Sequence, residues 1–272
     1  MVTKFSSQTA SEYLSGEKLY GDDFTPEQIA AWFEDERDGY FDLEQSGVFA
    51  DKYAYGYHAR NKRHGFRYLP DSPFREVLGV GSAYGDELLP ILERCEKVTI
   101  LEPADGFQNE RFTYVKPSPS GHFPFKDNSF DLITCLSVLH HIPNVSFVIG
   151  EIARVLRPGG YALMTEPTHS MGDWNYPRRG LTKRERGIPA AMQRRIILES
   201  GLTILHETKC HFSLTSRLIH ITRDSPFNHG WVIRMDELIS RMPIWPTSYH
   251  PAIWLQKIKP CALFFVLTKS ES

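Results

Sequence analysis

A glycine-rich turn between two apolar runs has the residue types and spacing best suited to bind a ligand. Residues 77–85 read Val-Leu-Gly-Val-Gly-Ser-Ala-Tyr-Gly, and an amphipathic stretch, 86–92, follows them. This order predicts a strand, a tight loop and a helix, in which glycines let the backbone approach a ligand and the helix N-terminus offers free N–H groups. The next apolar run, 98–101, is followed by Glu102, whose carboxylate is placed to accept hydrogen bonds from two ribose hydroxyls. Together these residues predict a site for an adenosine-containing cofactor.

Length and composition limit the number of domains, the partners and the cellular compartment of the protein. The 272 residues suffice for one large domain with embellishments, or for about one and a half domains. The net charge of −2 favours neither nucleic acid nor an anionic membrane as partner. No apolar run is long enough to span a membrane, and the first residues lack the apolar core of a signal peptide. No C-x-x-C pair is present among the cysteines, which are Cys95, Cys135, Cys210 and Cys261. We therefore expect neither a zinc site nor disulfides, and we expect the protein to be in the reducing cytoplasm.

A regular alternation of strands and helices begins at residue 74. We expect strands at 75–80, 97–102, 112–115, 130–136, 160–166, 203–208 and 262–267, and helices at 85–95, 146–156, 186–199 and 229–241. This alternation predicts a parallel sheet with helices on both faces. Residues 1–73 lack the pattern and are expected to form a helical extension or lid, with a helix starting at 25–28 (Thr-Pro-Glu-Gln). Residues 74–272 are expected to form the main domain, with a substrate-covering insertion at about 211–260.

Three further segments narrow the choice of cofactor. They are 123–133 (Phe-Pro-Phe-Lys-Asp-Asn-Ser-Phe-Asp-Leu-Ile), 136–143 (Leu-Ser-Val-Leu-His-His-Ile-Pro) and 155–163 (Val-Leu-Arg-Pro-Gly-Gly-Tyr-Ala-Leu). With the glycine loop and Glu102, they resemble the class I S-adenosylmethionine-dependent methyltransferases, especially the small-molecule branch, over roughly residues 74–166. A glycine loop alone also nearly fits a nicotinamide dinucleotide fold, and the downstream segments favour the methyltransferase. Residues 172–189 bear a weaker resemblance to methyltransferases of bacterial polysaccharide gene clusters.

The resemblance implies a Rossmann-like α/β fold with a seven-stranded, mostly parallel sheet, an antiparallel last strand and helices on both faces. The cofactor implied is S-adenosylmethionine. The residues expected to bind it are Gly79, Gly81, Ser82, Ala83, Gly85, Glu102, Pro103, Leu136 and Ser137. The loop departs from the family pattern, because an acidic residue usually stands at the position of Gly79 and a glycine at that of Ala83. These departures leave open a relative that keeps the fold without catalysis.

Histidines near the strand ends are the candidate bases. An alcohol acceptor must lose its proton when it is methylated, and a neutral imidazole can take that proton near pH 7. His141 is the first candidate, with His140 and His169 as alternatives, while framework packing is the competing interpretation. No tight acidic motif is present, so no metal is predicted, although Glu166 and Asp173 lie in the right region.

Two basic clusters, at 58–67 and 178–186, are either solvated faces or a rim that attracts an anionic acceptor. The residues expected to contact the acceptor are Tyr176, Arg178, Arg179 and Trp245. We therefore expect methylation of a small molecule or sugar, with a nucleotide- or lipid-linked sugar among the candidates, and with oxygen favoured over nitrogen. Nucleic acid is not favoured as a partner, and a homodimer is possible. The alternatives are a nicotinamide-dependent oxidoreductase and a non-catalytic partner protein.

Overall fold

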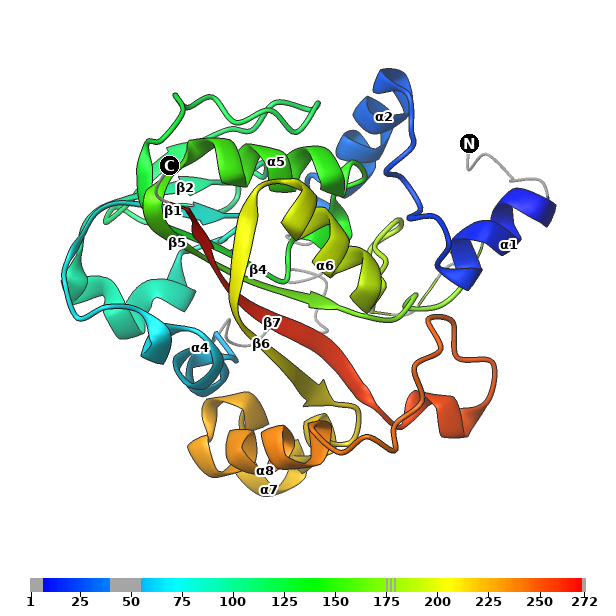
Figure 1. The fold of residues 1–272 in the computed structure, drawn as a ribbon. Coiled ribbons are helices and arrows are strands. Elements are labelled where there is room, and N and C mark those ends of the chain that lie inside the picture. The colour runs from blue at the N-terminus through cyan, green and yellow to red at the C-terminus, as the bar shows by residue number, and fades with distance from the viewer. Residues whose placement is uncertain (1–6, 40–54, 175, 177, 179, 271–272) are drawn as a thin grey trace.

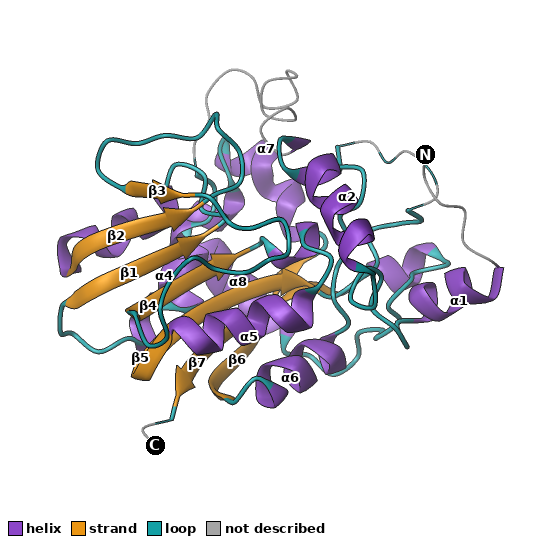
Figure 2. Ribbon diagram, turned by 90° about the horizontal axis from the view of Figure 1, so that it is seen from above, coloured by secondary structure: helices purple, strands orange, loops and turns teal. Residues whose placement is uncertain are grey.

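A seven-stranded sheet forms the centre of the molecule (Figures 1 and 2). The computed structural model describes residues 7–39, 55–174, 176, 178 and 180–270. The strands lie in the order β3-β2-β1-β4-β5-β7-β6. Their bounds are β1 Phe74–Val80, β2 Cys95–Leu101, β3 Thr113–Val115, β4 Phe130–Leu136, β5 Leu156–Pro167, β6 Leu202–Phe212 and β7 Pro260–Lys269.

The directions of the strands confirm the predicted fold class. β1 to β5 pair in parallel, whereas β7 lies between β5 and β6 and runs antiparallel to both. The predicted pair at 203–208 and 262–267 is therefore present as β6 and β7. Parallel strands bring all their carboxyl ends to one edge, which in open α/β sheets is the edge where ligands bind.

Helices cover both faces of the sheet (Figure 2). α5 (Val145–Val155) and α6 (Ala190–Glu199) lie on one face, and α4 (His58–His64) and α8 (Gly230–Ser240) lie on the other. Each face has its own apolar core, one built on α5 and α6 and the other on the turns that follow α4 and β1. The sheet is thereby buried on both sides, as its apolar strands require.

Three predicted elements differ in the structure. The helix expected at 85–95 is a series of 3-10 turns, Asp86–Arg94, because Pro90 supplies no N–H for an α-helical hydrogen bond. The helix expected from 186 begins only at Ala190, directly after Pro189. The fifth strand starts earlier than expected, because residues 156–160 already pair with β4 through a bulge.

The motifs at 128–131 and 157–160 fasten strands together. One carboxylate oxygen of Asp131 accepts hydrogen bonds from the backbone N–H groups of Arg75 and Glu76, both at 2.9 Å. The other oxygen lies 2.6 Å from Nη1 of Arg157. Asp131 thus joins β1, β4 and β5 at the edge away from the ligand-binding ends, which is a structural role.

In the described part of the N-terminal extension, α1 (Ser7–Ser15) and α2 (Pro26–Glu36) precede α4. The predicted cap of α2 is confirmed, since Thr25 and Gln28 exchange side-chain and backbone hydrogen bonds in a capping box. Trp32 on α2 is fully buried and donates a hydrogen bond to the carbonyl oxygen of His141, 2.6 Å away. α2 is therefore anchored beside the loop that follows β4.

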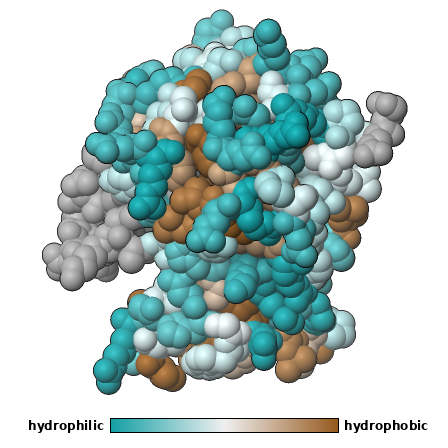
Figure 3. Space-filling view, turned by 90° about the vertical axis from the view of Figure 1, so that its left-hand side faces the viewer, coloured by the Kyte–Doolittle hydropathy of each residue, from teal (hydrophilic) through white to brown (hydrophobic). Residues whose placement is uncertain are grey.

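The insertion before β7 contains the short helix α7 (Ile219–Thr222), α8 and several 3-10 turns. α8 packs on β6 and on α4, so the insertion and the N-terminal extension meet on one face of the sheet. Within the described ranges, no helix combines the length and the apolarity needed to cross a membrane. On the face drawn in Figure 3, hydrophobic surface gathers near the centre, within hydrophilic surroundings.

Candidate cofactor and acceptor site

The glycine loop folds as a series of left-handed residues. Gly81, Ala83 and Gly85 have φ angles of +58°, +48° and +73°. The N–H of Gly81 donates to the carbonyl oxygen of Leu101, 2.8 Å away, which ties the loop to the end of β2. A Cβ atom on Gly81 would lie 2.5 Å from Cγ1 of Val138, so only glycine fits there. The loop is thus held close against β2 and against the turn after β4.

Glu102 lies where this loop meets β2. One of its carboxylate oxygens accepts the N–H of Ala83 at 3.2 Å, and the other accepts that of Ala104 at 3.1 Å. The residue is only 6% exposed, and this burial raises the pKa of its carboxyl group. The ring of Phe107 is buried against Ala83 and Ala104, so an apolar cap lies over this part of the loop.

The departure at Gly79 has a steric explanation. A Cβ atom at this position would lie 2.5 Å from Oγ of Ser82 and 2.8 Å from Cδ1 of Ile100, so no side chain fits. Another carboxyl group lies close to the loop, since Glu87 is buried and bonds to Ser82 and to Thr134, the latter at 3.3 Å. Burial raises the pKa of Glu87 to about 7, against the opposing effect of these hydrogen bonds. Sequence reasoning missed Glu87, although an acid in the first turn after the loop was a visible signal.

The other predicted cofactor residues lie at the same edge of the sheet. Leu136 ends β4, and Ser137 follows it with a φ angle of +64° and an N–H that donates to the carbonyl oxygen of Thr165, 2.8 Å away. The carbonyl oxygen of Pro103 accepts a hydrogen bond from Lys116 at 2.9 Å. The structure therefore brings the ends of β1, β2 and β4 together. Contact of each residue with a cofactor stays a prediction.

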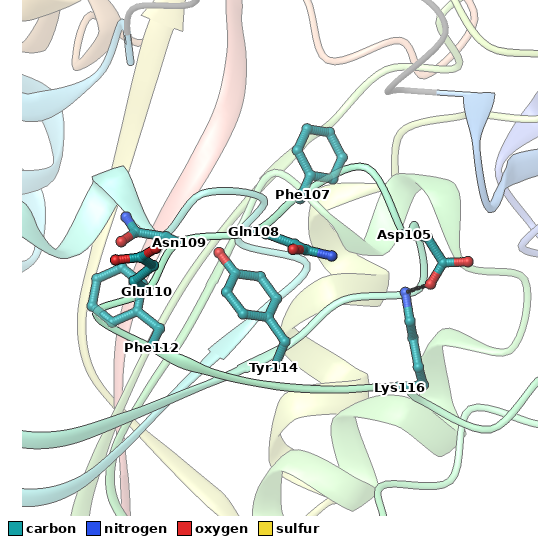
Figure 4. Close-up of a pocket in the computed structure, with 8 residues that line it drawn as sticks. All are labelled: Asp105, Phe107, Gln108, Asn109, Glu110, Phe112, Tyr114 and Lys116. Carbon is teal, nitrogen blue, oxygen red and sulfur yellow. Dashed lines mark ion pairs between the residues drawn. The ribbon is translucent and has the colours of Figure 1, made fainter.

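A cavity of about 530 Å³ lies beside the loop, around β3 and the segment before it (Figure 4). Its lining residues are Asp105, Phe107, Gln108, Asn109, Glu110, Phe112, Tyr114 and Lys116. Tyr114 donates its hydroxyl hydrogen to the carbonyl oxygen of Ala83, 2.9 Å away, so the cavity borders the glycine loop. Neither Glu102 nor a glycine of the loop lines it, so the cavity adjoins the predicted cofactor-binding residues without including them.

The candidate histidines are each held differently. Nδ1 of His140 lies 2.7 Å from a carboxylate oxygen of Glu166, and Nδ1 of His141 lies 3.0 Å from one of Glu36. Burial opposes protonation of His141, but the hydrogen bond to Glu36 and the charge of Glu185 outweigh it and raise its pKa. His169 lies after β5, where burial lowers its pKa to about 4 and keeps its ring neutral.

His140, His141 and Glu185 are the one group of potential metal ligands among the described residues, with ligand atoms within 4.8 Å of one another. The hydrogen bonds of both Nδ1 atoms to Glu166 and Glu36 account for the position of these rings. Glu166 also accepts the backbone N–H groups after β4, so it serves as an organiser of that turn. We assign no metal to this group.

Arg178, one of the predicted acceptor contacts, makes its hydrogen bonds within its own loop. Its two terminal nitrogens donate to the carbonyl oxygens of residues 171, 182, 183 and 185, and its contact with an acceptor stays a prediction. Trp245 donates its indole N–H to the carbonyl oxygen of Ile239 at 2.7 Å, which fixes it to the end of α8. Tyr176 is exposed on the surface, and Arg179 lies outside the described residues.

Because the backbone at Ala83 is left-handed, we expect its substitution by glycine to have little effect on the free energy of unfolding. In Ala83→Gly, the relief of about 1–2 kcal/mol of backbone strain offsets the lost methyl contact and the added freedom of the unfolded chain. We expect the free energy of unfolding to change by less than about 0.5 kcal/mol. Ala104→Gly is the matched control, since Ala104 packs in the same cluster without a positive φ angle. It should lose about 1–2 kcal/mol in urea unfolding. Equal losses in the two variants would show that Ala83 is unstrained.

Comparison with known proteins agrees with the fold. Residues 78–164 match the protein family described as a methyltransferase domain. This stretch contains the glycine loop, Glu102 and the turn after β4, so residues 78–164 form a methyltransferase domain.

Two curated relatives illustrate the range of that family. A phthiotriol/phenolphthiotriol dimycocerosates methyltransferase of Mycobacterium ulcerans is 38% identical over 71 residues, which are 24% of this chain and 26% of that protein. Sterol 24-C-methyltransferase of Schizosaccharomyces pombe is 49% identical over 69 residues, 25% of this chain and 17% of its own length. The matches span less than half the length of these relatives.

Solved structures resemble the chain over most of its length. The [4+2]-cyclase SpnF has a TM-score of 0.55 and 16% identity, with 92% of this chain and 98% of that chain covered. The N-methyltransferase NodS of Bradyrhizobium japonicum, solved with S-adenosylhomocysteine, has a TM-score of 0.51 and 14% identity, with 86% and 100% covered. At these identities the likeness concerns the fold.

Proposed function

We propose that the protein transfers a methyl group from S-adenosylmethionine to a small-molecule or carbohydrate acceptor, at oxygen in preference to nitrogen. The observation that carries this proposal is the position of Glu102, whose carboxylate lies at the end of β2 and bonds to the N–H of Ala83 in the glycine loop. When bound, the cofactor supplies a methyl group on a positively charged sulfur. The chain contributes by holding the acceptor in line with that group.

The topology argues against a nicotinamide-dependent oxidoreductase. A dinucleotide-binding sheet has the order 3-2-1-4-5-6, with its strands mostly parallel. Here an antiparallel strand, β7, is inserted between β5 and β6. A non-catalytic protein with this fold is the remaining alternative, since one fold hosts many activities.

The cellular compartment and the type of acceptor are also proposals. The cysteines of the chain are free, which supports a reducing, cytoplasmic setting. The names of the relatives include methyltransferases that act on carbon and on oxygen, so the preference for oxygen rests on the histidines of this chain. The helices α1 and α2, which precede the sheet, are proposed to act as part of a lid.

The pair of Glu36 and His141 supports a general base. A carboxylate that accepts a hydrogen bond from Nδ1 fixes the imidazole and raises its affinity for a proton. His141 is also close enough to Glu102 for its charge to lower the pKa of that carboxyl group, against the larger effect of burial. This proximity supports the proposal that His141 faces the cofactor. His140 and His169 stay as second candidates.

Substitution of His141 tests this role. We expect His141→Ala to lower turnover by about 10²- to 10⁴-fold, with the Kd for S-adenosylhomocysteine nearly unchanged. The acceptor for this assay is to be found by screening with methyl-labelled cofactor. Glu36→Gln should shift the acidic limb of the pH–rate profile to lower pH, because the Glu36 carboxylate raises the pKa of His141. Unchanged turnover in His141→Ala rules the residue out.

Calorimetry tests the proposed function as a whole. S-adenosylmethionine and S-adenosylhomocysteine should both bind to the purified chain, with one site each. Binding of neither compound would reject a methyltransferase. Binding of both without transfer to any acceptor in the screen would favour the non-catalytic alternative.

A further inference from the structure

Arg60 on α4 carries a charge that the described part of the chain does not neutralise. Its side chain is only 3% exposed, and its guanidinium carbon lies 4.1 Å from the centre of the Tyr57 ring. Nε donates to Oδ1 of Asn61 at 3.2 Å, while Nη2 has no hydrogen-bond partner. A planar guanidinium with a free, buried N–H edge matches the two oxygens of a carboxylate or phosphate.

Among the described residues, Arg60 forms no ion pair. The carboxylate of Asp236 on α8 interacts with its charge, but its oxygens accept hydrogen bonds from other groups. These are the N–H groups of His211 and Phe212 and the hydroxyl of Thr215, at 2.7–2.9 Å. Burial of an ion without a bound counter-ion costs several kcal/mol. Such a residue is expected where an anion binds and completes the pairing.

The groups around Arg60 are suited to binding an anionic ligand. His211 at the end of β6 has a φ angle of +59°, which is strained for this residue, and its ring stacks on Phe227 at 4.3 Å. Burial lowers the pKa of His211 to about 3 and that of His58 below its usual value, so both rings are neutral. Nδ1 of His58 is also buried without a partner. A neutral imidazole can donate one hydrogen bond to an anion, although the carboxylates of Asp86 and Asp236 also act on this region.

α4 contacts the 3-10 turns Asp86–Arg94 that follow the glycine loop, but it reaches further toward the end of β6. α4 packs on β7 and α8, and Arg60 acts on residues at the end of β6. β7 and β6 are three and four strands away from β1, the strand that carries the loop. At about 4.8 Å per strand, that is roughly 14–19 Å across the sheet. The insertion and the N-terminal extension meet here, through the contacts of α4 with α8.

We propose that Arg60 binds an anionic group, a carboxylate or a phosphate, of the methyl acceptor. This assignment rests on the proposed function, because it places the anion on the molecule that is methylated. The basic residues at 178–186, which the sequence suggested for this purpose, are not needed for it.

Thermal unfolding with inorganic phosphate and with acetate tests the anion site. For the wild-type chain, phosphate or acetate at a hundredfold excess over its Kd should raise Tm by about 5–10 °C. The shift should vanish in Arg60→Met and persist in Lys62→Met, a variant of an exposed cation on the same helix. In anion-free buffer, Arg60→Met should unfold at or above the wild-type Tm, because it removes an unpaired charge. If Arg60→Met does not fold, Arg60→Lys should show a reduced shift, since lysine lacks the planar fork.

Measurements of cofactor binding show whether Arg60 binds a carboxylate of the acceptor or the carboxylate in the amino-acid part of the cofactor. S-adenosylhomocysteine should bind equally to the wild type and Arg60→Met, and phosphate should not compete with it. If the variant loses affinity for S-adenosylhomocysteine but keeps that for methylthioadenosine, which lacks the amino-acid part, Arg60 holds the cofactor and the proposal is overturned. It is also overturned if neither phosphate nor acetate shifts the wild-type Tm. Failure of the wild type to bind S-adenosylhomocysteine would instead reject the proposed function.

Discussion

Replacement of Glu102 by glutamine should weaken S-adenosylhomocysteine binding by roughly 30- to 1000-fold, or about 2–4 kcal/mol. The carboxylate is expected to accept two hydrogen bonds from ribose, and it also holds the N–H groups of Ala83 and Ala104. An amide of the same shape has one acceptor oxygen and no charge, so it cannot serve all of these donors. Isothermal titration calorimetry measures the change directly.

The matched control is Asp105→Asn, which removes a carboxylate three residues further along the chain. Asp105 is exposed and pairs with Lys116 at 2.7 Å, so its loss should leave the Kd within about twofold. Unfolding by urea should show that both variants are folded. Equal affinity of Glu102→Gln and the wild type would contradict the placement of the cofactor at the end of β2.

The second large effect concerns stability rather than binding. Arg186 is fully buried, and its guanidinium donates to the carbonyl oxygens of Tyr20, Leu139, Ile142 and Pro143, at 2.8–3.0 Å. Arg186→Met leaves these four oxygens without their donor, and we expect a loss of about 3–5 kcal/mol in the free energy of unfolding. Urea unfolding followed by circular dichroism gives this value.

Arg195→Met provides the comparison for that experiment. Arg195 is exposed on α6, and its contact with Glu199 is 3.9 Å long, so its loss should change stability by less than about 0.5 kcal/mol. A loss below about 1 kcal/mol in Arg186→Met would mean that other residues hold the turn after β4 in place. That turn carries His140 and His141, so a folded Arg186→Met variant should also show disturbed histidine resonances.

The framework of the fold followed from local sequence patterns. Apolar runs, glycine turns and the cap at Thr25 predicted the strands, the loop and the start of α2, because these signals depend on neighbouring residues. The 3-10 turns after the loop were not predicted as such, although Pro90 lies inside them. Periodicity alone favoured a regular helix there, whereas the missing N–H of one proline decided the outcome.

The chemistry of individual side chains was harder to predict, because their partners are distant in sequence. Glu36 meets His141 across 105 positions, and Arg178 turns inward onto its own loop. Arg60 belonged to a cluster that also contains the exposed cations Lys62 and Arg67, and only the fold separates it from them. Burial, which distinguishes a binding group from a solvated one, is a property of the packed structure.

The position of β7 has a consequence for the order in which the sheet is completed. β7 is the last strand in sequence, yet it lies between β5 and β6. During synthesis, β6 therefore has no partner in the sheet, and one edge of β5 stays open, until residues 260–269 have left the ribosome. Unpaired strand edges are prone to association with other chains. The nascent chain is thus expected to depend on chaperones until its final strand closes the gap.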